Sequence, residues 1–536
     1  MNSSPASSRR WIFPLLALIV AALVVWKSEP PEETEDLRPT DSPQNRESAT
    51  PTGSPQDSAF VAPPPSAYKT PDQKDWIVSF ARIEDLRAFQ KAWQERFPDD
   101  RLQILSELRS LRVQTRDPSA RVALRELLPD DAERLPNTRV RLPHGPDFSQ
   151  IPPSHYQPFQ EGLRSWLGAP ENIGEWGGNV QIAVLDTGIK DWGRETSLSQ
   201  LDLLSHIPLD EESGQHGRAV SLLMVGEEGL APAADLFSVR VLDGRGEGDV
   251  FTVADGLIRA VDQGARVINL SLGTYEDNQL LREAVDYAHR RGAVLVAAAG
   301  NDGGESLPFP AAYPGVISVS AIDAERQHAH FSNRGPVDLA APGVGVFLPW
   351  SDEQMLQISG TSASSPIVAG AIAGLLSQEP SLSPQEAAHR LIETADDAGP
   401  PGYDSQWGHG VLSLERALRH GQPGIHDPAI ADFHLHPTPR PDGSFEATVS
   451  VQNRGTERSS GMLLEVQGAD GSFSFSVPSL APGKVEGFSL SLSPGDLARG
   501  DGLRLEAILQ TPPGMPDENP ENNRKAVDFQ ISPPED

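Results

Sequence analysis

Three largely apolar runs, each followed by a polar residue and a glycine, constrain the fold of this chain more than any other feature. They lead into Asp186-Thr187-Gly188, Ser271-Leu272-Gly273 and Gly300-Asn301. Runs of this kind are typical of strands that are covered on both faces, as in a parallel sheet between two layers of helices. Because such sheets keep their chemistry at the carboxyl ends of the strands, we expect an α/β domain with a functional site at that edge.

A fourth segment predicts a hydroxyl group at the start of a buried helix. Ser359–Ser362 leads into a run of small and apolar residues that reaches Leu376. The partial positive charge at a helix N-terminus helps a serine oxygen to carry developing negative charge. His216 is also predicted to begin a short helix. Each signal has an ordinary alternative, since a serine often caps a core helix and a single histidine more often lies on the surface.

Taken together, these segments resemble the subtilisin-like serine proteases (the peptidase S8 family) in their residues, their order and their spacing. The resemblance covers roughly residues 160–420, about half of the chain. It rests on Ala183–Gly188, His216-Gly217, Gly229–Pro232, Val267–Gly273, Ala297–Asn301, Phe331–Pro336 and Gly360–Gly370. It implies a subtilisin-like three-layer fold for residues 146–421, with a parallel sheet and helices on both faces, and it implies serine endopeptidase activity.

The resemblance also implies a role for each matching catalytic residue. Asp186, His216 and Ser362 would form the triad, in the chain order that is known for subtilisin. Ser362 would attack the scissile carbonyl, His216 would take its proton, and Asp186 would hold the histidine tautomer. Asn301 would donate its side-chain amide to the oxyanion, together with the backbone N–H of Ser362.

Substrate contacts follow from the same resemblance. An extended peptide would pair as an added strand with the backbone of Ser271, Leu272 and Gly273. Asp302 would lie at the rim of the main pocket and favour basic or polar substrate side chains. The expected partners are therefore protein or peptide substrates.

No cofactor is required by this chemistry. Gly229 follows His216 by 13 positions, whereas many relatives have a longer segment there that includes a calcium-binding loop, so we expect no calcium at that place. Structural calcium elsewhere stays open, and the acidic stretch Asp517–Asn523 is either a calcium site or a solvated loop. The chain has no cysteine, which excludes disulfides, thiolate metal sites and a cysteine nucleophile.

The N-terminus predicts export. Arg9 and Arg10 precede an uncharged run, Trp11–Trp26, and acidic residues follow it, so the positive-inside rule places the rest of the chain outside the cytoplasm. We interpret residues 1–26 as an uncleaved membrane anchor, with a cleaved signal that leaves a secreted protein, or a twin-arginine signal, as alternatives. Residues 27–72 lack an apolar period and are rich in Pro, Ser, Thr and Glu, which predicts a disordered linker.

Residues 73–145 predict a small α+β domain. The apolar spacing gives the order β-α-β-β-α-β, from Trp76–Phe80 to a closing strand at Thr138–Leu142, which suggests a ferredoxin-like unit. Its position before the catalytic segments resembles that of an inhibitory propeptide, which implies a partner that the enzyme cuts from itself, within residues 141–150. A plain spacer domain is the alternative.

Residues 422–536 change character. About seven short alternating runs between turns predict an Ig-like β-sandwich. Asn453–Gly455 and Asp517–Asn523 resemble CARDB-type domains, which implies adhesion or substrate docking. A stabilising cap without a ligand is the alternative.

The overall charge limits the classes of partner, and two other functions compete with the serine protease. The net charge of −31 argues against nucleic acid and anionic membrane surfaces as partners. One competing function is an inactive protease scaffold whose sandwich binds a ligand, but the four catalytic positions are all filled. The other is an aspartic protease built on Asp186-Thr187-Gly188, which would need a second such motif.

Overall fold

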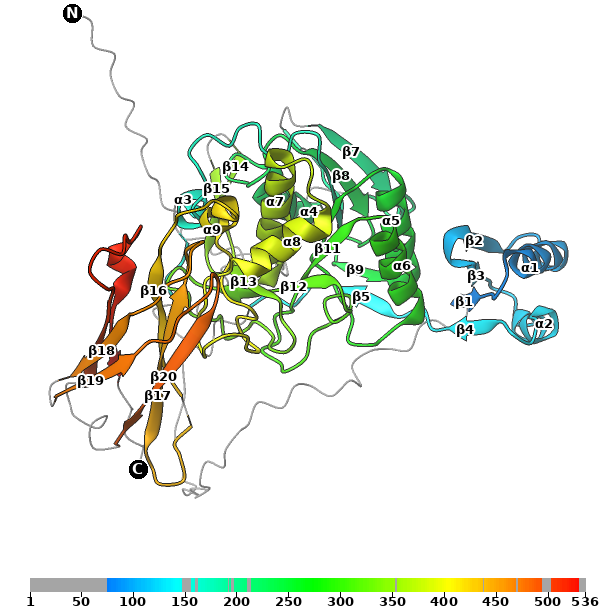
Figure 1. Cartoon of the computed structure of the whole chain (residues 1–536). Helices are drawn as coiled ribbons and strands as arrows, with labels where there is room; N and C mark the ends of the chain where they lie inside the picture. Colours follow the sequence, from blue (N-terminus) through cyan, green and yellow to red (C-terminus); the bar gives the residue numbers. More distant parts are fainter. Residues whose placement is uncertain are drawn as a thin grey trace, which may run out of the picture.

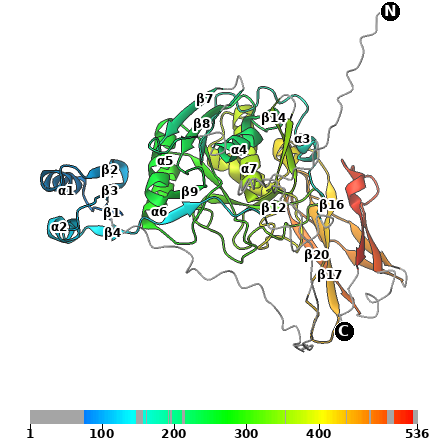
Figure 2. The ribbon, with the colours of Figure 1, turned by 180° about the vertical axis from the view of Figure 1, so that it is seen from behind.

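The computed structural model describes residues 75–146, 156–159, 162–190, 192–193, 197–209, 214–351, 354–436, 438–468, 471–493 and 503–529. An N-terminal unit and a C-terminal module lie at opposite ends of a larger central domain (Figure 1, and from behind in Figure 2). The predicted anchor, Trp11–Trp26, and the predicted linker, 27–72, lie outside the described residues. Within the described ranges, no helix has the length and apolar character needed to cross a membrane.

The N-terminal unit is an antiparallel sheet with two helices packed on it. Leu86, Phe89 and Trp93 are spaced three and four positions apart along the first helix, so they share one face and are buried against the sheet. The sheet order is β2-β3-β1-β4. The elements are β1 (Asp75–Ser79), α1 (Ile83–Arg96), β2 (Arg101–Leu105), the 3-10 turn η2 (Ser106–Leu108), β3 (Ser110–Gln114), α2 (Ala120–Leu127) and β4 (Glu133–Leu135).

The prediction for the closing strand of this unit was wrong. The strand that completes its sheet is β4, whereas Thr138–Leu142 contains β5 (Arg139–Arg141), which pairs with β9 (Glu247–Asp249) of the central domain. Val140 is fully buried in the core of the central domain. Alternation of apolar residues identifies a strand but does not say which sheet it joins. Here Val140 is buried in a core of the central domain, in agreement with the pairing of β5 with β9.

The central domain is built on a sheet of seven strands, and the predicted parallel arrangement is confirmed. Each neighbouring pair is parallel. In sheet order the strands are β13 (Leu339–Pro342), β12 (Val316–Ile322), β11 (Val294–Ala298), β10 (Val267–Leu270), β6 (Gln181–Asp186), β8 (Asp235–Arg240) and β7 (Leu198–Asp202). The expected α/β class is confirmed.

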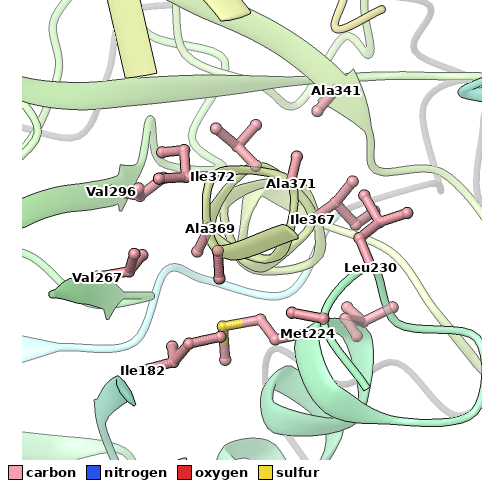
Figure 3. Close-up of a cluster of buried hydrophobic side chains, with 14 of the residues drawn as sticks. Ile182, Met224, Leu230, Val267, Val296, Ala341, Ile367, Ala369, Ala371 and Ile372 are labelled. Carbon is pink, nitrogen blue, oxygen red and sulfur yellow. The ribbon is translucent and has the colours of Figure 1, made fainter. Parts of the chain in front are cut away.

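Helices cover both faces of this sheet and give two separate cores. Along β6, Ile182 and Val184 point into the core formed with α4 (Gln215–Val225), α7 (Thr361–Gln378) and α8 (Pro384–Glu393). Ala183 and Leu185 point into the core formed with α5 (Val250–Asp262) and α6 (Gln279–Arg290). Successive strand residues face opposite sides, so an all-apolar strand requires both layers. Figure 3 shows α7 enclosed by apolar side chains from the sheet and from α4.

The remaining elements of the central domain lie at its margins. They are α3 (Leu163–Trp166), the hairpin of β14 (Val346–Ser351) and β15 (Gln354–Ile358), and α9 (Leu414–Arg419). At the start of α8, Ser383 and Glu386 form a capping box, in which each side chain bonds to the other residue's backbone N–H.

The C-terminal module consists of two antiparallel sheets around one apolar core. Buried and exposed residues alternate along the third strand of the larger sheet, as the sequence predicts. The sheets are β16-β17-β20 and β19-β18-β21-β22. Their strands are β16 (Pro428–Leu435), β17 (Phe445–Asn453), β18 (Leu463–Gly468), β19 (Gly471–Ser476), β20 (Val485–Leu492), β21 (Leu503–Gln510) and β22 (Arg524–Phe529), and the turn η4 (Pro520–Asn523) precedes β22.

A buried ion network joins this module to the central domain. The carboxylate of Asp396, which is 6% exposed, lies 3.1 Å from Arg326, 3.3 Å from Arg416 and 3.4 Å from Arg454. Arg454 follows β17 of the module, whereas the other three residues belong to the central domain. Beside it, Gln452 accepts a hydrogen bond from the backbone N–H of Asp397 and donates one to a central-domain carbonyl. Charges and amides with several partners fix one orientation of the module on the central domain.

Candidate active site

A buried aspartate and histidine meet at the carboxyl end of β6, an interior strand of the sheet. Asp186 is the last residue of β6, and His216 is the second residue of α4. The Nδ1 atom of His216 lies 2.8 Å from one oxygen of Asp186 and 2.9 Å from the other. His216 and Asp186 are 5% and 1% exposed, respectively. A carboxylate at this position favours the tautomer that carries its hydrogen on Nδ1 and leaves Nε2 free to accept a proton.

The approach of α4 to β6 requires a glycine after the histidine. A Cβ atom on Gly217 would lie 2.4 Å from the carbonyl oxygen of Gly188, which is closer than real side chains allow. The backbone N–H of Gly217 also donates to the hydroxyl of Thr187 at 3.2 Å. The Asp186-Thr187-Gly188 turn and the start of α4 thus hold each other, and this contact sets the position of the His216 ring.

The candidate nucleophile stands on the first turn of the buried helix α7. Ser362 is the second residue of α7 and is 3% exposed. Gly360 precedes the helix with a φ of 130°, a conformation that side-chain-bearing residues rarely adopt. A Cβ atom there would also lie 2.9 Å from the Asn301 amide nitrogen. Glycine therefore permits both the sharp entry into α7 and the close approach of Asn301.

Asn301 is oriented by the same turn. Its Oδ1 atom accepts hydrogen bonds from the backbone N–H of Thr361 at 2.9 Å and from the Thr361 hydroxyl at 2.8 Å. That hydroxyl in turn accepts from the backbone N–H of Gly300 at 3.1 Å. Because the amide oxygen is held in this way, the Nδ2 group is left to act as a donor. The sequence analysis missed the part played by Thr361, although it stands beside Ser362 in the motif.

One side-chain atom of His216 and one of Ser362 have no hydrogen-bond partner within the described part of the chain. They are Nε2 of His216 and Oγ of Ser362, and both are buried. Buried polar atoms are nearly always satisfied, so an exception calls for an explanation. A base with an available nitrogen and a hydroxyl with an available proton give that explanation, since each would be engaged during proton transfer.

Of the three predicted substrate-binding residues, Gly273 contacts an extended segment of the chain itself. Its N–H donates to the carbonyl of Arg141 at 2.8 Å, and its carbonyl accepts from the N–H of Arg141 at 2.9 Å. Leu272 is buried in the core. The Ser271 hydroxyl bonds to the Ser362 carbonyl and to the Ser365 hydroxyl, so its side chain fixes α7 on the end of β10.

The same segment continues through the site to the candidate oxyanion donor. Leu142 donates its N–H to the carbonyl of Gly246 at 3.0 Å. Two residues later, the carbonyl of His144 accepts a hydrogen bond of 2.8 Å from Nδ2 of Asn301. Gly273 of the predicted substrate-binding strand and the predicted oxyanion donor Asn301 thus both form hydrogen bonds with the segment Arg141–His144.

The ring of His144 pairs with Asp302 at the edge of the cleft. Its Nδ1 atom lies 2.8 Å from the carboxylate, and this hydrogen bond raises the pKa of His144 above its ordinary value. Burial alone would raise the pKa of Asp302, but hydrogen bonds from His144 and from the Tyr275 hydroxyl lower it below the usual range. Asp302 therefore pairs with a histidine whose pKa is raised, and its place at the rim of a substrate pocket stays a prediction.

Alternative chemistries find little support in this site. The neighbour of the Asp186 carboxylate is a histidine, whereas an aspartic protease needs a second aspartate beside it. Across the described residues, no group of three or more His, Cys, Asp or Glu side chains could hold a metal ion. In the stretch Asp517–Asn523, the carboxylate of Asp517 accepts hydrogen bonds from Asn519 and Asn523 of the same loop.

Comparison with known proteins points in one direction. The model of the subtilase family (Peptidase S8) matches residues 177–410, which include all four candidate catalytic positions. The thermostable alkaline protease of Halalkalibacterium halodurans is 36% identical over 255 residues, which are 46% of this chain and 70% of that protein. Subtilisin Savinase of Lederbergia lenta is 34% identical over 258 residues, 47% of this chain and 95% of that protein. The minor extracellular protease Epr of Bacillus subtilis is 32% identical over 247 residues, 45% of this chain and 38% of that protein.

Proposed function

The chain belongs to the subtilase family and is a subtilisin-like serine endopeptidase, and from this premise we propose that Asp186, His216 and Ser362 are its catalytic triad. Ser362 Oγ attacks the carbonyl carbon of the substrate, and its proton passes to Nε2 of His216. Asp186 keeps the other ring nitrogen protonated and stabilises the imidazolium. The same proton then goes to the leaving amine, and water hydrolyses the acyl-enzyme in a second round.

Asn301 is the proposed oxyanion donor. In the tetrahedral intermediate, the carbonyl oxygen of the substrate becomes negative and accepts from Nδ2 of Asn301 and from the backbone N–H of Ser362. The hydrogen bonds from Thr361 orient the amide before the reaction begins. An oxyanion donor held in this way contributes about 3 kcal/mol to stabilisation of the transition state.

We further propose that the enzyme is made as a zymogen and cuts itself between His144 and Gly145. The observation that carries this proposal is the 2.8 Å hydrogen bond from Asn301 Nδ2 to the carbonyl oxygen of His144. It is the interaction expected of a scissile carbonyl, and the bond lies within the interval 141–150 that the sequence predicts. Residues 73–144 would then be the propeptide, with a ferredoxin-like unit and a C-terminal tail that fills the cleft until it is released.

The hydrogen bond between His144 and Asp302 suggests which residue is accepted at the cleavage point. A carboxylate at the pocket rim favours a basic or polar side chain directly before the cleaved bond. We therefore propose Asp302 as a contributor to specificity at that position.

Location and the C-terminal module are also proposals. We propose that the enzyme acts outside the cytoplasm and is attached to the membrane through residues 11–26, with release after signal cleavage as the alternative; one relative is named as an extracellular protease. For residues 422–536 we propose a CARDB-like, Ig-like sandwich. The buried contacts of Arg454 and Gln452 with the central domain favour a stabilising role.

One experiment tests the triad and the processing site together. The full chain and its Ser362→Ala variant are expressed, separated on a gel and sequenced from the N-terminus. We expect the wild-type product to begin at Gly145 and the variant to stay whole. A fluorophosphonate probe should label only the wild type. If the variant is cut at the same bond, Ser362 is not the nucleophile that cuts it; if the wild type is neither cut nor labelled, an inactive scaffold is the better interpretation.

A further inference from the structure

We propose that Glu247 selects substrates that carry an arginine three positions before the residue whose carbonyl is attacked. The inference rests on the proposed function, because it takes His144 as the residue before the cleaved bond. Arg141 then occupies the position in question. It adds an acidic subsite to the cleft at a point that neither Asp302 nor the triad reaches.

The backbone around Arg141 is held by contacts that do not depend on its side chain. Strand β5 pairs with β9, with Arg141 opposite Glu247. On its other side, Arg141 forms two hydrogen bonds with Gly273, of 2.8 and 2.9 Å. Any peptide in extended conformation could make these bonds. Selection at this position must therefore come from the side chain, and the side chain that faces it decides what is selected.

Glu247 supplies the charge at this point. Its Oε1 atom lies 3.3 Å from the guanidinium of Arg141, while Arg139 and Arg245 lie 3.7 and 3.6 Å from Oε2. The Arg141 and Glu247 side chains are 33% and 30% exposed, whereas Arg245 is 79% exposed. Of the three ion pairs of Glu247, the one with Arg141 has the shortest distance, and its arginine is less exposed than Arg245. Shielding from water strengthens an ion pair.

A glycine directly before Glu247 leaves room for the bound segment. This residue, Gly246, precedes β9, which begins at Glu247. A Cβ atom on Gly246 would lie 2.7 Å from the side chain of Leu142, so glycine makes room for the residue that follows Arg141. The guanidinium of arginine also sheds water more readily than the ammonium of lysine and presents several donors to a carboxylate. We therefore expect arginine to be preferred over lysine, and both over neutral residues.

The test compares two peptides on the self-processed enzyme. They are identical except for arginine or alanine three positions before the residue that precedes the cleaved bond. For the wild type we expect kcat/KM to be about five-fold to ten-fold higher for the arginine peptide, the range of a partly shielded ion pair. Glu247→Gln should bring the ratio close to one, and Glu247→Arg should favour a third peptide with glutamate at that position. Glu171→Gln, a change at an exposed glutamate, serves as the matched control and should keep the wild-type ratio.

The outcomes separate this inference from the proposed function. If the wild type hydrolyses the peptides in a Ser362-dependent way but shows no preference for arginine, the selection by Glu247 is wrong and the peptidase stands. A preference that survives Glu247→Gln also overturns it. If neither peptide is cut and the chain does not process itself, both proposals fail. If the Glu247 variants do not mature, two measurements still test the proposal: the peptide series on the wild type and the self-processing rate of Arg141→Ala. We expect that rate to be about five-fold lower than the wild-type rate.

Discussion

Replacing Asp396 with asparagine should destabilise the protein strongly, although the residue is remote from the proposed chemistry. Its carboxylate lies between Arg326, Arg416 and Arg454 and is almost fully buried. Burial alone would raise the pKa of Asp396, but the three guanidinium groups overcome this and lower it from 3.8 to about 2. A shift of this size corresponds to about 2 kcal/mol of stability in favour of the charged form. Removing one partner of a buried ion network lowers the free energy of unfolding by about 3 to 5 kcal/mol, because the charges that remain are buried without their partner.

The assay is thermal unfolding in the Ser362→Ala background, which prevents self-digestion. At neutral pH we expect Asp396→Asn to lower Tm by roughly 5 to 15 °C. Because the folded-state pKa is depressed, the contribution of Asp396 is present above the unfolded value and is lost as pH falls through about 2. Stability of the variant should therefore fall less steeply than that of the parent protein across this acid range.

A matched control comes from an exposed ion pair in the C-terminal module. Arg504 and Asp528 lie 3.2 Å apart, with side chains 71% and 62% exposed. Asp528→Asn should change stability by no more than about 0.5 kcal/mol. If Asp396→Asn unfolds at the same temperature as this control, the network does not hold the module to the central domain, and the reasoning from burial and charge is refuted.

Further predictions concern the catalytic turn, the triad and two titrating groups. Thr361→Val removes one of the two bonds that orient Asn301 and should lower kcat about ten-fold with little change in KM, as steady-state kinetics would show. Asp186→Asn should lower kcat by about 10⁴, and a loss of less than ten-fold would contradict the triad. Burial, together with nearby carboxylates, raises the pKa of Asp397 to about 7, so stability should fall as pH rises from about 4 to about 7, and denaturant titrations of Asp397→Asn should lack this slope. The raised pKa of His144 implies that the proposed propeptide, once cut, binds more tightly at acid pH and more weakly as pH rises; gel filtration of the processed complex against His144→Gln would test this.

Much of the central domain could be predicted because its elements are strongly patterned. A strand such as β6 is buried on both faces, so its sequence is apolar throughout, and that pattern is rare outside parallel sheets. The box at Ser383 and Glu386 marks the start of α8 because two side chains must be placed three residues apart to form it. Such features depend on neighbours in sequence and can be identified without knowledge of the fold.

Contacts between distant segments could not be predicted in the same way. The strand around Val140 was expected in the N-terminal sheet but pairs with β9, since alternation fixes the faces of a strand and not its partner. The network around Asp396 brings together residues from four separate stretches of the chain, and no local sequence pattern predicts it. The triad residues were identified through a family resemblance, whereas the positions of Thr361 and His144 against Asn301 became clear only from the folded chain.

The pairing of β5 with β9 and with Gly273 would connect the proposed self-processing with inhibition. Hydrogen bonds of the Arg141 backbone hold the peptide in the cleft whether or not the bond after His144 is intact. Cleavage would therefore not by itself release the proposed propeptide, and the buried contacts of Val140 would oppose release further. The side-chain pairs with Glu247 and Asp302 are the contacts that a change of pH or a competing basic substrate can weaken. On this reasoning, a substrate that satisfies both carboxylates would also be an efficient displacer of the propeptide, so activation and substrate choice depend on the same two acidic residues.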